Sequence, residues 1–277
     1  MNEKTLKVLE FDKIIKKLAG FATSNLGKAM AEELLPATNI ETVRERLQET
    51  DDAVSYIVKR GTPPLGGIHD IKDSLKRVEM GSILMPGELL KVSDVLRLCR
   101  LLKKHAFTDS KTAEEKSIVL DLINSLEPNK RIEDKISAAI ISEEEIADDA
   151  SPTLRNIRRQ ITEQQESIKE KLNSIIKSPK YQKFIQESIV TIREGRYVIP
   201  VKQEYRSEIP GLIHDSSASG ATIFIEPMAV VEANNYIKQL LIKEQAEIEK
   251  ILAELTAEVA SILEQLKLNI SILARLD

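Results

Sequence analysis

The feature that most constrains this chain is the stretch 228–276, which contains neither proline nor glycine. As one helix it would run roughly 73 Å at 1.5 Å per residue, and so long a helix needs a partner along its side. Leucine, isoleucine and valine recur in it at intervals of seven, in two registers that together form a coiled-coil seam. The registers are Leu241, Ile248, Leu255 and Ile262, and Leu252, Val259, Leu266 and Leu273.

A second stretch is suited to be that partner. Ser151 followed by Pro152 is a strong helix start, because serine accepts hydrogen bonds from free amides and proline fits the first helical position. Apolar residues spaced by seven follow it: Leu154, Ile161, Ile168 and Ile175. We therefore expect two helices that run in opposite directions as an antiparallel stalk, with the chain between them inserted at its tip.

The inserted chain carries the β-strand pattern of this sequence. Runs of β-branched and aromatic residues flank a turn at Glu194-Gly195, where glycine accepts the positive φ of a tight reversal. A second pair of runs flanks residues 218–220, so two hairpins predict a four-stranded antiparallel sheet. Pro200 has no amide hydrogen for a ladder, and we expect its strand at an edge or beside a bulge.

The first 130 residues are predicted to form a compact helical domain. Apolar residues recur there at helical spacing, interrupted at 61–68 by a stretch rich in proline and glycine. One helix should be capped by Thr38 or Asn39, with an apolar side and a solvated side. The apolar side holds Val43, Leu47, Ala53, Val54, Ile57 and Val58, and the solvated side Arg44, Glu45, Arg46 and Glu49. Aromatic residues are only 4% of the chain and tryptophan is absent, which favours packed helices, so the fold class is mainly α.

The residues that could support catalysis do not form a recognisable site. His69, His105 and His214 stand far apart and in no metal-ligand spacing, so we expect structural roles and no metal. The pair Gly27-Lys28 lacks the glycine spacing and the hydroxyl residue of a phosphate loop, which predicts a surface lysine on a helix.

Sequence composition also bears on the compartment. The single cysteine, Cys99, lies in an apolar run and should be a small buried hydrophobe, and one cysteine excludes a disulfide framework. We find no signal peptide and no apolar run of about 18 residues, so we expect a soluble cytoplasmic protein without a membrane partner. The net charge of −4 argues against a wholly basic nucleic-acid binder.

Local charge nevertheless favours a nucleic-acid contact. Residues 177–227 hold seven lysines and arginines against six acids, a balance of +1, whereas the rest of the chain has −5. Basic side chains and turn hydroxyls are the groups that contact phosphates. The alternative is that the basic residues only pair with Glu194 and Glu204 across the strands. The candidate nucleic-acid-binding residues are Lys183, Arg193, Arg196, Lys202, Arg206, Ser217 and Ser219.

Four motifs suggest a family: PLGGIHD at 64–70, DASP at 149–152, REGRYVIPV at 193–201 and DSSASGATIFIEP at 215–227. Together they resemble the MutS-II group of MutS-type ATPases, which carry a C-terminal Smr nuclease domain, and the likeness spans essentially the whole chain. The resemblance implies a helical core domain at 1–130 and rising lever helices at 131–186. It implies a β clamp at 187–227 and a returning lever helix at 228–277.

The resemblance also implies a longer, homodimeric protein. Relatives continue into an ATPase module, which uses ATP and Mg²⁺, and then into the Smr nuclease. Because no phosphate loop occurs in residues 1–277, we expect no ATP hydrolysis, nuclease activity or cofactor in this part.

Three functions remain open on this basis. The clamp could grip the backbone of branched or recombination DNA, in a protein that suppresses homologous recombination. It could instead bind rRNA or ribosomal protein, in a sensor that splits collided ribosomes. As a third alternative, the chain could be a coiled-coil interaction module without nucleic-acid contact. Backbone phosphates are alike in DNA and RNA, so the sequence does not decide between the first two.

Overall fold

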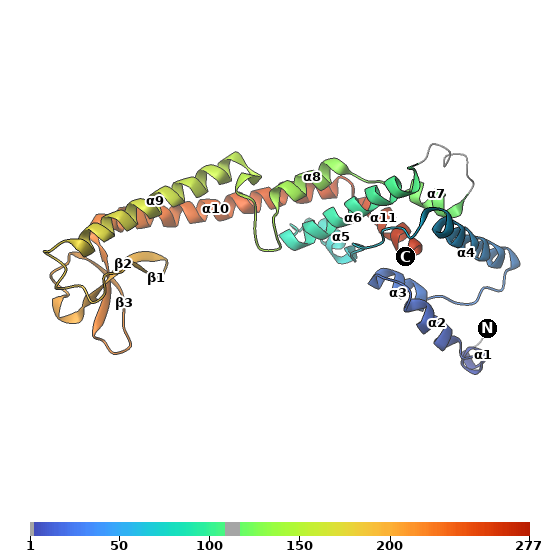
Figure 1. The fold of residues 1–277 in the computed structure, drawn as a ribbon, viewed down its shortest axis with the longest axis horizontal. Helices are drawn as coiled ribbons and strands as arrows, with labels where there is room; N and C mark the ends of the chain where they lie inside the picture. The colour runs from blue at the N-terminus through green and yellow to red at the C-terminus, as the bar shows by residue number, and fades with distance from the viewer. Residues whose placement is uncertain (1–2, 109–116) are drawn as a thin grey trace. The chain divides into compact units, whose positions relative to one another are not determined.

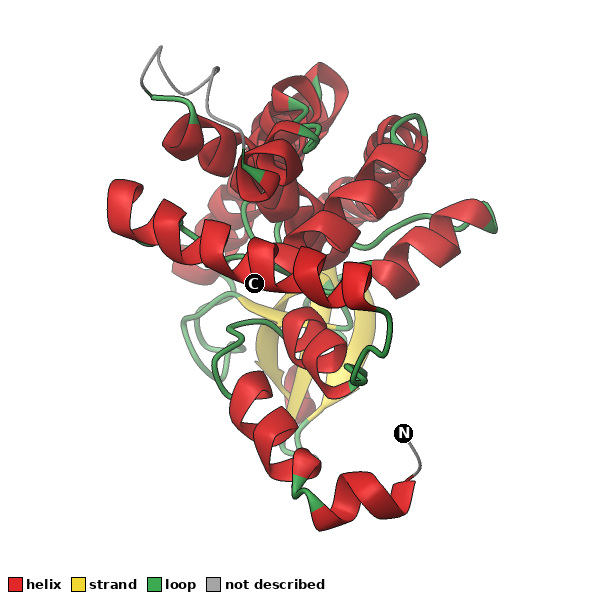
Figure 2. Ribbon diagram, turned by 90° about the vertical axis from the view of Figure 1, so that its right-hand side faces the viewer, coloured by secondary structure: helices red, strands yellow, loops and turns green. Residues whose placement is uncertain are grey.

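The structure is a computed structural model that describes residues 3–108 and 117–277. Helices make up most of it, and one four-stranded antiparallel sheet completes it (Figures 1 and 2). The chain divides into two compact units, one of Met1–Ala147 with Leu252–Asp277 and one of Asp148–Ile251. We call them the core unit and the clamp unit. The mainly α fold class with a small antiparallel sheet is confirmed, while the finer division into core, lever and clamp stays a prediction.

The described part of the core unit is built from helices, with one isolated β-bridge between Ile140 and Ile146. Helix α6 is its centre, because Leu89, Val92, Leu96 and Leu102 are fully buried. Cys99 is buried on the same helix as predicted, and burial raises the pKa of its thiol to about 12. The helices of this unit are α1 (Glu3–Val8), α2 (Phe11–Ala19), α3 (Asn25–Glu32), α4 (Ile40–Arg60), α5 (Lys72–Glu79), α6 (Pro86–Ala106), α7 (Ile118–Asn124), α8 (Lys130–Ala139), the end of α10 (Met228–Ala260) and α11 (Leu263–Leu276).

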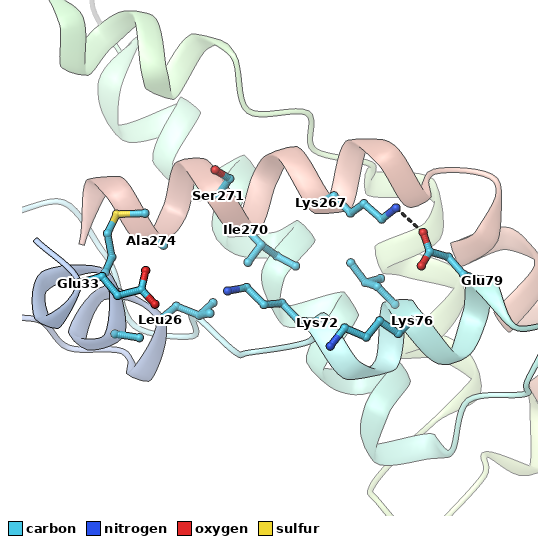
Figure 3. Close-up of a pocket in the computed structure, with 12 residues that line it drawn as sticks. Leu26, Glu33, Lys72, Lys76, Glu79, Lys267, Ile270, Ser271 and Ala274 are labelled. Carbon is cyan, nitrogen blue, oxygen red and sulfur yellow. Dashed lines mark hydrogen bonds and ion pairs between the residues drawn. The ribbon is translucent and has the colours of Figure 1, made fainter.

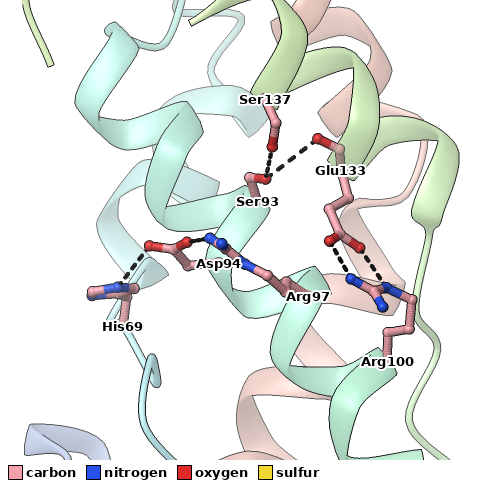
Figure 4. Close-up of polar contacts among 7 residues, drawn as sticks. All are labelled: His69, Ser93, Asp94, Arg97, Arg100, Glu133 and Ser137. Atoms are coloured by element: carbon pink, nitrogen blue, oxygen red, sulfur yellow. Dashed lines mark hydrogen bonds and ion pairs between the residues drawn. The ribbon is translucent and has the colours of Figure 1, made fainter. Parts of the chain in front are cut away.

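Polar side chains attach the neighbouring segments to α6 (Figure 4). His69 Nε2 lies 3.2 Å from Asp94 Oδ2, which ties the 64–70 motif to this helix. Arg100 donates to both oxygens of the buried Glu133 on α8, at 3.0 and 2.7 Å. A bidentate arginine compensates the buried carboxylate, so α6 and α8 are held in one register.

The clamp unit consists of one helix, a sheet and the first part of α10. Its elements before α10 are η2 (Asp148–Ala150), α9 (Pro152–Lys177), β1 (Thr191–Arg193), β2 (Arg196–Lys202), η3 (Gln203–Tyr205), β3 (Gly211–Ser216) and β4 (Thr222–Pro227). The strand order is β1-β2-β4-β3, and every neighbouring pair is antiparallel. Ser151 Oγ accepts from Leu154 N at 3.0 Å, which confirms the predicted start of α9.

Backbone geometry confirms the first predicted hairpin. Glu194 and Gly195 both have positive φ, 50° and 73°, between the paired residues Arg193 and Arg196, as a two-residue type I′ turn requires. The expectation for Pro200 is wrong, because β2 lies between β1 and β4. At Pro200 strand β1 has already ended, and the short segment 184–186 takes its place beside β2. The missing amide hydrogen therefore costs a bond only toward this irregular neighbour.

The predicted antiparallel pairing of the two stalk helices is confirmed within the clamp unit. Ser151 bonds to Glu247, whereas Gln160, nine residues further along α9, bonds to Tyr236. On α10 the predicted register is wrong at Leu241, which is 47% exposed, while Leu240 is buried. The reason is that the side of α10 that contacts α9 contains Leu240 together with Glu244 and Glu247, which follow it at helical spacing. Arg158 Nε of α9 donates to Glu244 at 2.7 Å.

The prediction of one uninterrupted helix over 228–276 is also wrong. Helix α10 ends at Ala260 and α11 begins at Leu263. Ser261 Oγ donates to the carbonyl of Glu258 at 2.6 Å, and Ile262 N bonds only three residues back, to Val259. A hydroxyl that competes for a helical carbonyl loosens the ladder, so the break needs neither proline nor glycine. In the part of the chain that is described, no helix is long and apolar enough to cross a membrane.

Candidate nucleic-acid interface

The sheet of the clamp unit is fixed by a core on one side. Its buried members come from α9, the sheet, α10 and the connecting segments that hold Phe184, Ile185 and Ile209. Tyr181 and Tyr205 are packed at its margin. The core residues are Ile168, Leu172, Ile176, Phe184, Ile185, Tyr197, Ile199, Val201, Ile209, Ile223, Ile225, Val230 and Ile237. Because the sheet cannot shift against such a core, the polar side chains at its ends have defined positions.

Five of the seven candidate residues gather at the end of β2. Lys202 Nζ donates to the carbonyl of Lys183 at 3.1 Å, and Arg206 follows directly after η3. Lys183 and Arg206 are exposed, and Lys202 is half-buried. We call Lys183, Lys202 and Arg206 the basic cluster. Lys202 and Arg206 flank η3, and the fold brings Lys183 from an earlier segment beside them.

The two candidate serines belong to the turn beside this cluster. Lys202 is paired with Thr222, the first residue of β4, so the β3–β4 turn lies at the same end of the sheet. Ser217 Oγ accepts from Thr222 N at 3.1 Å and lies 3.3 Å from Ser219 Oγ. Gly220 closes the turn with φ of 73°. The turn therefore presents hydroxyl groups next to the lysines.

Aromatic rings support the lysines, a feature that sequence reasoning missed. Lys183 Nζ lies 4.8 Å from the centroid of the Phe184 ring, which packs against Tyr205 at 4.9 Å. Lys180 Nζ likewise lies 4.9 Å from the centroid of the Tyr181 ring. Cation–π contacts of this kind hold an ammonium group over a ring without neutralising its charge. The alternation of lysine and aromatic residues over 180–184 is the signal that could have indicated them.

Arg196 has a different environment, inside the clamp unit. Its guanidinium donates to both oxygens of Glu226, at 2.8 and 3.0 Å, and to Asn235 Oδ1 at 2.6 Å. Glu226 is fully buried and also contacts His214 Nε2 at 2.6 Å and Asn234 Nδ2 at 2.8 Å. A buried carboxylate is tolerated only with such partners. We call these residues the Glu226 network.

Arg193 also has a partner within the sheet. Its Nε lies 3.1 Å from Asp215 Oδ2, and its guanidinium lies 4.1 Å from the centroid of the Phe224 ring. The side chain remains 39% exposed. The acids that pair with the two arginines are therefore Asp215 and Glu226, and not the Glu194 and Glu204 considered from the sequence.

A cavity of about 460 Å³ lies in the core unit (Figure 3). Its floor is apolar, with Leu26 and Ile270, and Lys72 lies at its rim. Lys267, also at the rim, already pairs with Glu79 and Glu264. Within residues 3–108 and 117–277, no group of three or more histidines, cysteines and acids could hold a metal ion. The clamp therefore remains the better candidate site.

Comparison with known proteins identifies sequence relatives of one name. No protein-family model matches the chain. Over all 277 residues it is 68% identical to "Endonuclease MutS2" of Acetivibrio thermocellus and 61% identical to the protein of that name from Ruminiclostridium cellulolyticum. The protein of the same name from Clostridioides difficile is 50% identical over the same length. The chain spans 35% of the length of each of these relatives. By this similarity along its whole length, the chain belongs to the MutS2, or MutS-II, family.

Proposed function

We propose that the clamp unit grips nucleic-acid backbone as part of a MutS-II-type ATPase and endonuclease, with branched or recombination DNA as its target. The basic cluster is the observation that carries the proposal. It sets two lysines and an arginine beside the hydroxyls of the β3–β4 turn, which are the groups that contact phosphate oxygens. The name that the relatives bear, an endonuclease, supports DNA as the target.

The geometry favours contact with the backbone over reading of bases. The Phe184 ring is buried and lies under Lys183, so it is not open for stacking on a base. The cluster stands on strand ends and loops, and it offers no helix that could enter a major groove. Binding should therefore be independent of sequence and strongly dependent on salt.

Other activities belong to the longer protein in this proposal. ATP and Mg²⁺ would be held by segments outside these 277 residues, as would the nuclease site. The homodimer would bring two clamps to one nucleic acid. In this arrangement the stalk helices α9 and α10 link the clamp to the parts that hydrolyse ATP.

The test is a triple charge reversal, Lys183→Glu with Lys202→Glu and Arg206→Glu. Affinity for duplex DNA, four-way branched DNA and ribosomes would be measured by titration at several salt concentrations. For three phosphate contacts, we expect a slope of log affinity against log salt of roughly −2.7 on duplex DNA. The triple variant should bind more weakly and with a slope close to zero.

A matched control carries the same change in charge elsewhere. Lys171, Lys238 and Lys243 are exposed on α9 and α10, and their triple change to Glu should leave the slope as it is. If the cluster variant kept its affinity for both DNA and ribosomes, the proposal would fail. A loss on ribosomes alone, with DNA binding intact, would make the ribosome the target. No measurable binding by the unchanged chain would leave the interaction module as its function.

A further inference from the structure

Helix α4 packs on the core unit by its polar side. Asp52 Oδ2 accepts from Ile118 N at 2.8 Å at the start of α7, and Glu49 pairs with Arg275 of α11. Tyr56 is the one buried residue among the 21 of α4, and its hydroxyl lies 2.7 Å from His105 Nδ1. Glu49 was expected on the solvated side, and the structure reverses that expectation.

Most of the apolar side of α4 consequently faces outward, and Val43 is half-buried. Leu47 is 66% exposed, and Ile40, Val54 and Ile57 are exposed as well. The predicted cap is present, since Asn39 Oδ1 accepts from Glu41 N at 2.7 Å, so the helix itself is well formed. An amphipathic helix normally turns its apolar stripe to the core, and an exposed stripe of this length indicates an interaction surface.

The spacing of the stripe is that of a coiled coil. Its positions alternate by three and four residues over three heptads. The a positions are Ile40, Leu47 and Val54, and the d positions are Val43, Thr50 and Ile57. Spacing of this kind is typical of a helix that pairs with one other helix in a coiled coil, and Val58, an exposed e position, widens the stripe at its end. The surface therefore fits one partner helix laid along α4.

We propose that this partner is α4 of a second copy of the chain, in antiparallel orientation. With Ile40 opposite Ile57, Val43 opposite Val54 and Leu47 opposite Thr50, every seam position meets one from the other copy. In an antiparallel pair, each e position faces an e position of its partner. The charged e positions are Arg44 and Asp51, which have opposite sign, so each would pair with the other across the two-fold axis.

Neighbouring contacts favour the antiparallel arrangement over the parallel one. A parallel pair would bring g positions against e positions, and Arg46 would have to reach Asp51. Arg46 is already occupied, because it donates to the carbonyl of Leu35 at 3.1 Å. Ala53 and Arg60, the other g positions, are half-buried toward their own core unit. The e side is therefore the open side of the seam.

The test is an exchange of charges in the 277-residue chain. Arg44→Asp, or Asp51→Arg alone, turns two symmetric attractions into repulsions and should weaken self-association about tenfold, or 1.4 kcal/mol. The double variant restores both pairs with the charges exchanged, so it should recover the original dimer. Analytical ultracentrifugation would measure these constants. A double variant no better than the singles would overturn the antiparallel pairing.

Cysteine cross-linking tests the register independently. Val43→Cys together with Val54→Cys should give an oxidised dimer, whereas Val43→Cys alone should not, since a parallel pair is needed to bring residue 43 against itself. The native Cys99 does not interfere, because it is buried and its thiol pKa is raised to about 12.

The remaining outcomes also decide the proposal. Leu47→Glu should abolish the dimer while leaving thermal unfolding unchanged, because this side chain is solvent-exposed in the single chain. A chain that stays monomeric up to about 1 mM, or a dimer that Leu47→Glu leaves intact, would show that another partner covers α4. Nucleic-acid binding does not enter these measurements, so their failure would not touch the function proposed for the clamp.

Discussion

Strand β2 begins with Arg196 and ends with Lys202, and these two basic residues have opposite environments. Arg196 is only 20% exposed and is bound to the fully buried Glu226. Lys202 has no carboxylate partner among the described contacts and donates to a backbone carbonyl. The difference teaches that the number of basic residues in a segment does not locate a binding surface. The partner of each charge within the fold decides whether that charge is available.

The largest expected effect comes from breaking the Glu226 network. Arg196→Ala leaves a buried carboxylate without its bidentate cation, which should cost about 3–5 kcal/mol in the clamp unit. Because the chain has two units, hydrogen exchange of the β2 and β4 amides is the proper measurement, rather than one global melting curve.

Two further variants sharpen this expectation. Arg206→Ala is the matched control, since that arginine is exposed, and it should change stability by no more than about 0.5 kcal/mol. Glu226→Gln added to Arg196→Ala removes the uncompensated charge and should recover part of the loss. If Arg196→Ala left the hydrogen-exchange protection of the β2 and β4 amides unchanged, the two ends of β2 would not differ in the way described.

An intermediate effect is expected at Arg193, which combines features of both environments. It has a carboxylate partner in Asp215 and a ring contact with Phe224, yet it is 39% exposed. Arg193→Ala should cost about 1 kcal/mol, because partly exposed ion pairs and cation–π contacts each contribute little. Arg193→Lys keeps the charge but loses the planar stack on Phe224. Its stability, measured by hydrogen exchange, should lie between that of the unchanged chain and that of Arg193→Ala. A loss equal to that of Arg196→Ala would place Arg193 within the buried network.

The smallest effect on stability is expected at Lys202. Lys202→Ala should change the free energy of unfolding by less than about 0.5 kcal/mol, since the side chain makes one bond to a carbonyl. It should nevertheless reduce the salt slope of DNA binding by roughly 0.9, the contribution of one phosphate contact. Titrations against salt for Lys202→Ala and for Lys238→Ala would separate the two effects. A stability loss without a change of slope would assign Lys202 a purely structural role.

Much of the fold was predictable because its signals are local. The cap at Ser151, the positive φ of the Glu194-Gly195 turn and the burial of Cys99 each follow from a few neighbouring residues. One error lies where a long-range contact overrides a local pattern, and another where a local side-chain bond interrupts a helix. Leu241 fits the seven-residue register, but the face of α10 that meets α9 also carries Glu244. The helix break at Ser261 depends on a side-chain bond that no periodicity reveals.

The candidate site was predictable only as a set of residues. The sequence placed Lys183, Lys202 and Arg206 in one basic segment, and it could not show that they gather at one end of the sheet. It left open whether the arginines pair internally, and the acids it considered are not the ones that the structure places beside them. A pairing across strands depends on their order in the sheet, which spacing along the chain does not encode.

The sequence by itself determined the start of α9, the first hairpin turn and the mainly α class and, through its motifs, the family to which the chain belongs. Helix caps, heptads and hairpin turns act over a few residues, so their physics is contained in the order of the amino acids. Only the tertiary structure decided which charges remain available. Glu226 is buried among segments that lie apart in the sequence and meet only in the fold. A buried carboxylate needs a cation beside it, and here that cation is Arg196. That requirement engages Arg196 inside the fold, whereas Lys202 donates only to a backbone carbonyl among the described contacts.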